Sequence, residues 1–247
     1  MSTHLPEPIS PSKSRVYQAL IERFDLLLRA KYPLIYIVTA EEEPVEEILT
    51  EVALQSSPSR RILFWDIARG WSDNNADKGS VMAALSRIAQ RDKLTKDGDN
   101  VLYVLRDLHP ILKYPHNERH IAIIRELKNL SRDLKRDRRA IALTSHTLEI
   151  PAELTEEVTA IDFPLAAITE IEYLIKQKIS ANKLNLSNLA WEQLVKACQG
   201  LSRTRIQRVL AKAIAEKEEV NDSDIDAVLA EKQQAIRQTG ILEFFTV

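Results

Sequence analysis

Four polar residues stand where they could take part in phosphoryl transfer. Asp107 and Thr144 each follow a short apolar run, and Arg203 and Arg205 open an apolar-periodic stretch later in the chain. An aspartate at a strand end can hold Mg²⁺, a threonine beside it can contact a γ-phosphate, and arginines can neutralise the phosphate charge. These residue types indicate the edge of a nucleotide site, so the four are candidates for vestigial nucleotide contacts.

The loop that would hold the phosphates is missing from this pattern. Such a loop has the spacing GxxxxGK[ST], and none of the five glycines here precedes a lysine. The first apolar run is followed instead by Glu41, Glu42 and Glu43, whose carboxylates would repel a triphosphate. Leu108 follows Asp107 where a hydrolase would place a glutamate as general base. We therefore predict no catalytic residue and no cofactor.

Each of these groups also has a purely structural interpretation. The carboxylates of Glu41, Glu42 and Glu43 suit the first turn of a helix, although we also consider them as an interaction edge for a partner. Asp107 could form an ion pair with its neighbour Arg106, and Arg203 and Arg205 could be an exposed basic helix start.

Two further groups of residues suggest metal or nucleic-acid binding. His116 and His120 are four residues apart, but Asn117 stands where the motif H-E-x-x-H has its glutamate. His109 is near in sequence, yet no third ligand is evident, so we expect no metal site. Residues 125–139 are basic, but interleaved acidic residues favour a solvated helix face. A net charge of -2 adds no general attraction to nucleic acid.

The candidates must be positioned by a parallel sheet. Apolar runs that predict strands cover residues 34–38, 62–65, 101–105, 140–143 and 158–161, and helix-patterned segments near residues 45–54, 81–88 and 121–134 separate them. An amphipathic helix also follows Ser14. Because each parallel crossover needs a covering helix, residues 14–165 are predicted to form a five-stranded, mostly parallel α/β domain with helices on both faces.

The pattern changes after Pro164. Apolar residues then recur at helical spacing in about four groups, which predicts a small all-α, lid-like domain over residues 166–240. Ser187 and Ser202 are predicted N-caps, and Gly200 is a predicted C-cap. Residues 1–13 are expected to be a disordered tail and residues 241–247 a C-terminal tail. No apolar run approaches the ~20 residues needed to cross a bilayer, so no membrane insertion is expected.

A sheet followed by a helical lid is the plan of AAA-type nucleotide-binding modules. The chain also resembles the N-terminal half of a conserved cyanobacterial and chloroplast family of AAA proteins, through LLLRAKYPLIYI at 26–37, LKNLSRDLK at 127–135 and IRQTGILEF at 236–244. The resemblance implies a degenerate AAA-like half whose C-terminal tail leads toward an AAA module with intact nucleotide motifs, absent here. It also implies a cyanobacterial cytoplasm or plastid stroma, and a connection with photosynthesis and inorganic-carbon uptake.

These observations favour a non-catalytic AAA-like domain that binds a protein, either the family's own C-terminal AAA module or a regulated target. Two alternatives stay open. One is a weak ATP-binding or ATPase module that uses Asp107 with Arg203 or Arg205 and is completed in a homo-oligomer. The other, less favoured, is a nucleic-acid adaptor that binds through residues 125–139.

Overall fold

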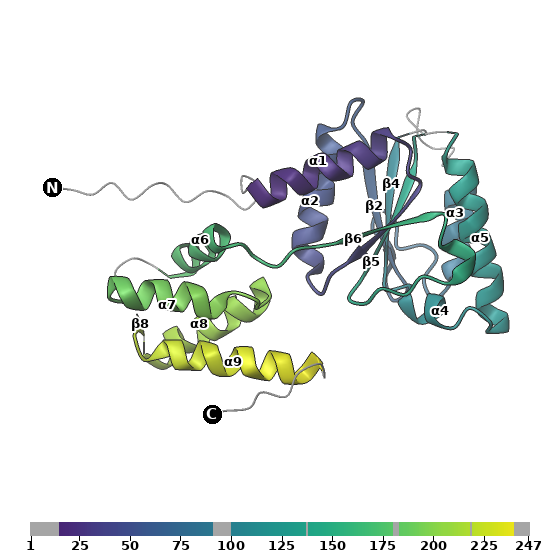
Figure 1. Ribbon diagram of the computed structural model, residues 1–247. Coiled ribbons are helices and arrows are strands. Elements are labelled where there is room, and N and C mark those ends of the chain that lie inside the picture. Colours follow the sequence, from purple (N-terminus) through teal and green to yellow (C-terminus); the bar gives the residue numbers. More distant parts are fainter. Residues whose placement is uncertain (1–14, 91–99, 137, 180–182, 218, 240–247) are drawn as a thin grey trace. The chain divides into compact units, whose positions relative to one another are not determined.

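The chain forms two compact units in the computed structural model (Figure 1), which describes residues 15–90, 100–136, 138–179, 183–217 and 219–239. One unit is residues 19–163, and the other joins the described residues before Ala19 to those from Pro164 onward. The helix α1 (Arg15–Arg29) contributes residues to both units. Both predicted tails lie outside the described residues.

The unit of residues 19–163 is built on a six-stranded sheet in the order β3-β2-β4-β5-β1-β6. The pairings among β1, β2, β4, β5 and β6 are parallel, as predicted, and these strands match the five apolar runs to within two residues at each end. Their bounds are β1 Leu34–Val38, β2 Arg61–Asp66, β4 Val101–Arg106, β5 Ala140–Ser145 and β6 Val158–Asp162.

The predicted count of five strands was wrong by one. The sixth, β3 (Gly70–Trp71), runs antiparallel to β2 at the edge of the sheet and pairs Trp71 with Trp65. A two-residue strand has no periodicity from which it could be recognised, and it forms because both tryptophans are fully buried. Their indole nitrogens both donate to Asp77, Trp65 to its backbone oxygen at 3.2 Å and Trp71 to its carboxylate at 3.0 Å.

Helices cover both faces of this sheet, with α1 and α2 on one side and α3 and α5 on the other (Figure 1). One face packs alternate strand residues such as Tyr36, Tyr103 and Leu143 against α3 and α5 in a single apolar core. This alternation is the two-residue period of a β-strand. The bounds are α2 Glu42–Gln55, α3 Val81–Ala89, α4 His109–Lys113, α5 Glu118–Leu134 and the 3-10 turn η2 Ala152–Leu154.

The second unit has the four predicted helices, which are α6 Ile168–Lys178, α7 Asn188–Cys198, α8 Arg203–Lys217 and α9 Asp224–Thr239. Ser187 caps α7 by accepting a hydrogen bond from Ala190 N at 3.2 Å, and Gly200 takes the left-handed conformation expected of a helix C-cap. The expectation of an all-α unit needs one correction, because β7 (Leu184–Asn185) and β8 (Val220–Asn221) form a short parallel pair.

Cys198 lies in the core of the helical unit, where its side chain is fully buried. Burial raises the pKa of its thiol to about 12, which keeps the thiol protonated. Among the described helices, none combines the length and the apolar character needed to cross a membrane.

Candidate functional site

The carboxyl ends of β1, β4 and β5 meet at one edge of the sheet. Val38 pairs with Ser145, and Arg106 pairs with Thr144, so the residues that follow these strands emerge together. The chain leaves β1 toward β2 on one side and leaves β5 toward β6 on the other. In open α/β sheets such a reversal of strand order marks the place where ligands bind.

Two of the predicted site residues come together at this edge. Asp107 follows β4 and donates its backbone N–H to the carbonyl oxygen of Thr144 at 2.9 Å. Its φ of 55° is rare outside glycine, although aspartate tolerates it better than most residues. Thr144 is 3% exposed, and its Oγ1 has no hydrogen-bond partner among the described residues. The pairing of neighbouring parallel strands, and not sequence spacing, brings Asp107 and Thr144 together.

The connection between β1 and α2 is only three residues long. Thr39 donates its N–H to Ser145 O at 2.7 Å, and its Oγ1 accepts from Glu41 N at 2.8 Å, so the turn is closed by its own hydrogen bonds. Glu41 is 5% exposed, whereas Glu42 and Glu43 lie at the surface at the start of α2. Of the three glutamates in the predicted interaction edge, Glu42 and Glu43 are exposed, and the edge itself stays a prediction. Three residues are too few for a loop of the GxxxxGK[ST] type.

The guanidinium of Arg106 lies beside this turn and is bound by acidic side chains. Its Nε and Nη2 donate to the two carboxylate oxygens of Glu46 at 2.6 and 2.9 Å, and its Nη1 donates to Asp66 at 3.2 Å. The hydrogen bond to Glu46 is the main reason that the pKa of Arg106 is raised. The described ion pairs of Arg106 thus go to α2 and β2, not to the neighbouring Asp107. Sequence analysis missed this network because its partners are 40 and 60 residues away.

Replacing this arginine tests the importance of the network. In Arg106→Gln, Glu46 in α2 loses a bidentate partner on the sheet, and Asp66 loses one hydrogen bond. We expect the free energy of unfolding in urea to fall by about 2 kcal/mol, between the costs of breaking exposed and buried pairs. Arg29→Gln is the control, because Arg29 bonds Asp25 at an exposed i,i+4 position and should change stability by less than ~0.5 kcal/mol. Equal effects of the two changes would contradict the prediction.

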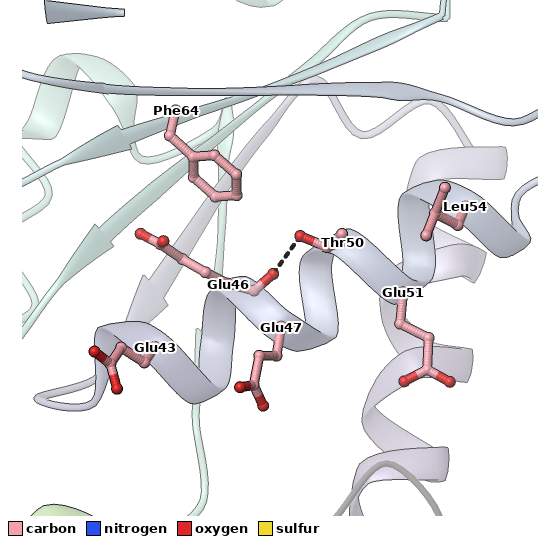
Figure 2. Close-up of a pocket in the computed structure, with 7 residues that line it drawn as sticks. All are labelled: Glu43, Glu46, Glu47, Thr50, Glu51, Leu54 and Phe64. Atoms are coloured by element: carbon pink, nitrogen blue, oxygen red, sulfur yellow. Dashed lines mark hydrogen bonds between the residues drawn. The ribbon is translucent and has the colours of Figure 1, made fainter. Parts of the chain in front are cut away.

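A groove of about 570 Å³ lies between α2 and β2. Phe64 and Leu54 provide its apolar part, and the other lining residues are Glu43, Glu46, Glu47, Thr50 and Glu51. Figure 2 shows Glu46 and Thr50 on the side of α2 nearer Phe64, whereas Glu47 and Glu51 point away from it. Among the described residues that line it are four glutamates and no lysine or arginine, although the Arg106 guanidinium lies over the Phe64 ring, 5.4 Å from its centroid.

A second cluster at the strand ends has the composition of a metal site. Ligand atoms of Asp107, His109 and His146 all lie within 4.8 Å of one another. His109 Nδ1 is 3.6 Å from Asp107 Oδ1 and 2.9 Å from Ser145 Oγ, and the two imidazole rings meet edge to face with centroids 4.5 Å apart. Burial and the nearby His146 lower the pKa of His109.

The cluster was not predicted from the sequence, where no metal site was expected. A signal was present, because His109 stands two residues after Asp107 and His146 directly follows the next strand of the sheet in space, β5. The pair that sequence analysis did consider, His116 and His120, is not part of the cluster. His120 Nδ1 lies 2.9 Å from the backbone oxygen of Tyr114.

The predicted arginines belong to the helical unit and are engaged there. Arg203 is 5% exposed, and its Nε and Nη2 donate to the carboxylate of Glu170 at 2.5 and 2.9 Å. Arg205 donates to Glu231 at 3.1 Å. The interpretation of Arg203 as an exposed helix start was wrong, because α6 and α8 bury the ion pair between them. Its role as a nucleotide contact stays a prediction.

The matched family models describe SpoVK-like AAA ATPases. The model of their N-terminal domain matches residues 20–163, and that of their second domain matches residues 169–239. Relatives named uncharacterized AAA domain-containing protein ycf46 are 36% identical in Guillardia theta and 35% identical in Trieres chinensis, over 94% and 90% of this chain. The chain spans only 44% and 43% of those relatives.

Solved structures of low sequence identity share the fold. The FIGL-1 AAA domain has a TM-score of 0.59 and 8% identity, covering 94% of this chain and 88% of that one. A chain of the E. coli MS115-1 HORMA:CdnC:Trip13 complex has a TM-score of 0.58 and 18% identity, covering 87% of this chain and 84% of that one.

Proposed function

Because the chain belongs to the SpoVK-like AAA ATPase family, we propose that it is a non-catalytic AAA-like module of that family, which binds a protein and neither binds nor hydrolyses ATP. The observation that carries this proposal is the turn between β1 and α2. Within these three residues Glu41 N donates to the side-chain hydroxyl of Thr39, and Thr39 N donates to Ser145 of β5. The helix α2 then begins with glutamates where an ATPase needs a lysine.

The surroundings of the turn support the same proposal. The nearby cation, Arg106, is already bound by Glu46 and Asp66, so a phosphate would have to break those bonds to reach it. Leu108, 3% exposed, belongs to the apolar core and offers no general base beside Asp107. Binding a triphosphate here would bring its charge close to Glu42 and Glu43, while Arg106 is already paired with acidic side chains.

An ATP titration tests the absence of nucleotide binding. We expect isothermal titration of the full chain with ATP and Mg²⁺ to give no binding heat, and no phosphate release above buffer. A P-loop protein in the same buffer is the positive control. Micromolar binding would overturn the proposal, and the weak ATPase alternative would then be favoured if Asp107→Asn abolished turnover.

The relatives are longer than the part that matches this chain. We propose that the unmatched part of such a protein is the binding partner. The exposed glutamates at the start of α2 and the groove between α2 and β2 support partner binding, because an acidic surface suits a segment rich in Lys and Arg. The E. coli HORMA:CdnC:Trip13 complex, one chain of which shares the fold, is an assembly of several proteins. From the family resemblance we also propose a cyanobacterial cytoplasm or plastid stroma and a part in regulating inorganic-carbon uptake.

Partner binding is tested with the C-terminal part of the Guillardia theta relative. We expect a complex in size-exclusion chromatography with light scattering, weakened about tenfold or more by Glu42→Lys with Glu43→Lys. Glu153→Lys with Glu156→Lys makes the same charge change at exposed positions away from α2 and should leave binding unchanged. If no complex forms, or if both double variants weaken it equally, the proposed partner and surface are wrong, whatever the ATP titration shows.

A further inference from the structure

The geometry points to a binding site for a divalent transition-metal ion of the zinc class, formed by Asp107, His109 and His146. These residues come from the end of β4, the start of α4 and the end of β5. The function proposed above, protein binding without ATP binding, does not require this metal site. The metal site likewise does not depend on that function.

The fold holds the three ligands in place by several contacts. The parallel pairing of β4 with β5 brings their carboxyl ends together, and the hydrogen bond from Asp107 N to Thr144 O extends that pairing by one residue. Asp107 is kept at a φ of 55°, a conformation that costs free energy for a residue with a Cβ. Such backbone strain in a residue that also offers a ligand atom is common at binding sites.

Two imidazoles and one carboxylate favour an ion of the zinc class over Mg²⁺. Imidazole nitrogen suits zinc and its neighbours in the first transition series, whereas Mg²⁺ prefers oxygen ligands only. A tetrahedral zinc site has bonds of about 2.0–2.2 Å, which place its ligand atoms roughly 3.3–3.6 Å apart. The present separations, none above 4.8 Å, need only a small side-chain movement to reach that range.

The exposure of the ligands predicts an open coordination sphere. Asp107 has a side chain that is 54% exposed, and His146 is also exposed, whereas the side chain of His109 is 20% exposed. With three protein ligands, water would complete the coordination, as in open zinc sites. When Nε2 of His109 is the ligand atom, Ser145 Oγ, 2.9 Å from His109 Nδ1, can orient the ring by hydrogen bonding, so Ser145 is a positioning residue.

Metal titration of the full chain tests the site. With Zn²⁺ and a competing chromophoric chelator, we expect one ion per chain, and no binding of Mg²⁺ at the same concentrations. His109→Ala with His146→Ala should weaken the binding by about 100-fold or more, and Asp107→Asn by about tenfold or more. Cobalt(II) provides a second readout, because binding with low coordination number gives strong visible absorption that the aqueous ion lacks.

The control removes the remaining histidines of the chain at once, as His4→Ala, His116→Ala and His120→Ala. This triple variant should bind one Zn²⁺ with unchanged affinity and give the same cobalt spectrum. Far-UV circular dichroism of each variant establishes that it is folded. The inference is wrong if the wild-type chain binds no Zn²⁺, if the folded double variant binds as tightly as wild type, or if the triple variant loses the ion.

Discussion

Glu170→Ala is expected to destabilise the helical unit by about 3–5 kcal/mol, because it leaves a buried arginine without its counter-charge. Glu170 and Arg203 are both at most 5% exposed. The carboxylate accepts two hydrogen bonds from the guanidinium and a third from Tyr17 OH at 2.7 Å. The guanidinium also lies over the Tyr17 ring, 5.1 Å from its centroid.

Hydrogen exchange measured by mass spectrometry locates the effect. Peptides from α6 to α9 should lose protection in Glu170→Ala, while peptides from β4 and β5 keep theirs, because the ion pair belongs to one unit only. Glu172→Ala, in the same helix but partly exposed, should cost less than ~1 kcal/mol. Glu170→Leu combined with Arg203→Met should recover much of the loss, because an apolar pair of similar volume avoids the unpaired charge. A double variant less stable than Glu170→Ala would contradict this explanation.

Gly70→Ala is expected to cost at least about 3–5 kcal/mol in the other unit. Gly70 has a φ of 76°, and a Cβ placed there would lie 2.1 Å from the backbone oxygen of Ala76. That oxygen accepts the hydrogen bond from Trp71 N at 3.0 Å, so the clash must open the turn that seats the buried Trp71. Losing the packing of a buried tryptophan has a cost in this range.

Gly79→Ala distinguishes the cost of the steric clash at Gly70 from the cost of a positive φ alone. Gly79 has a similar φ of 72°, but a Cβ there would meet nothing within 4 Å. The change should therefore cost only the strain of a left-handed residue, about 1–2 kcal/mol. Urea unfolding curves give both free energies, and hydrogen exchange in Gly70→Ala should increase in β2 and β3. If the two alanine variants are equally stable, the close approach at Gly70 is not what matters.

Most of the elements could be predicted because their signals are local. The run Leu34–Val38 is apolar throughout and became a central strand buried on both faces, and Ser187 became the cap of α7. By contrast, β3 was missed because only two residues form it, and α4 was missed because five residues show no helical period. These short elements are held by tertiary contacts, such as the edge-to-face packing of Trp71 on Tyr103.

The candidate site was predicted only where the sequence contained the whole motif. The lack of a phosphate loop could be recognised because its motif consists of residues close together in the sequence. The acidic start of α2 likewise follows from Glu42 and Glu43 themselves. The partners of Arg106 and Arg203 could not be found in this way, because Glu46 and Glu170 are 60 and 33 residues away. Ion pairs of this kind depend on which strands and helices become neighbours.

Local patterns in the sequence were thus enough to predict an α/β unit followed by a helical unit, and a first strand-to-helix turn that has glutamates in place of GxxxxGK[ST]. Tertiary contacts were needed to find what stands at the strand ends: a guanidinium bound by acidic side chains, and Asp107 beside His109 and His146. The physical reason is that apolar periodicity and capping act between near neighbours, whereas a site is assembled by strand pairing. Strand order is set by the packing of the whole sheet and cannot be recognised from the sequence of any single segment.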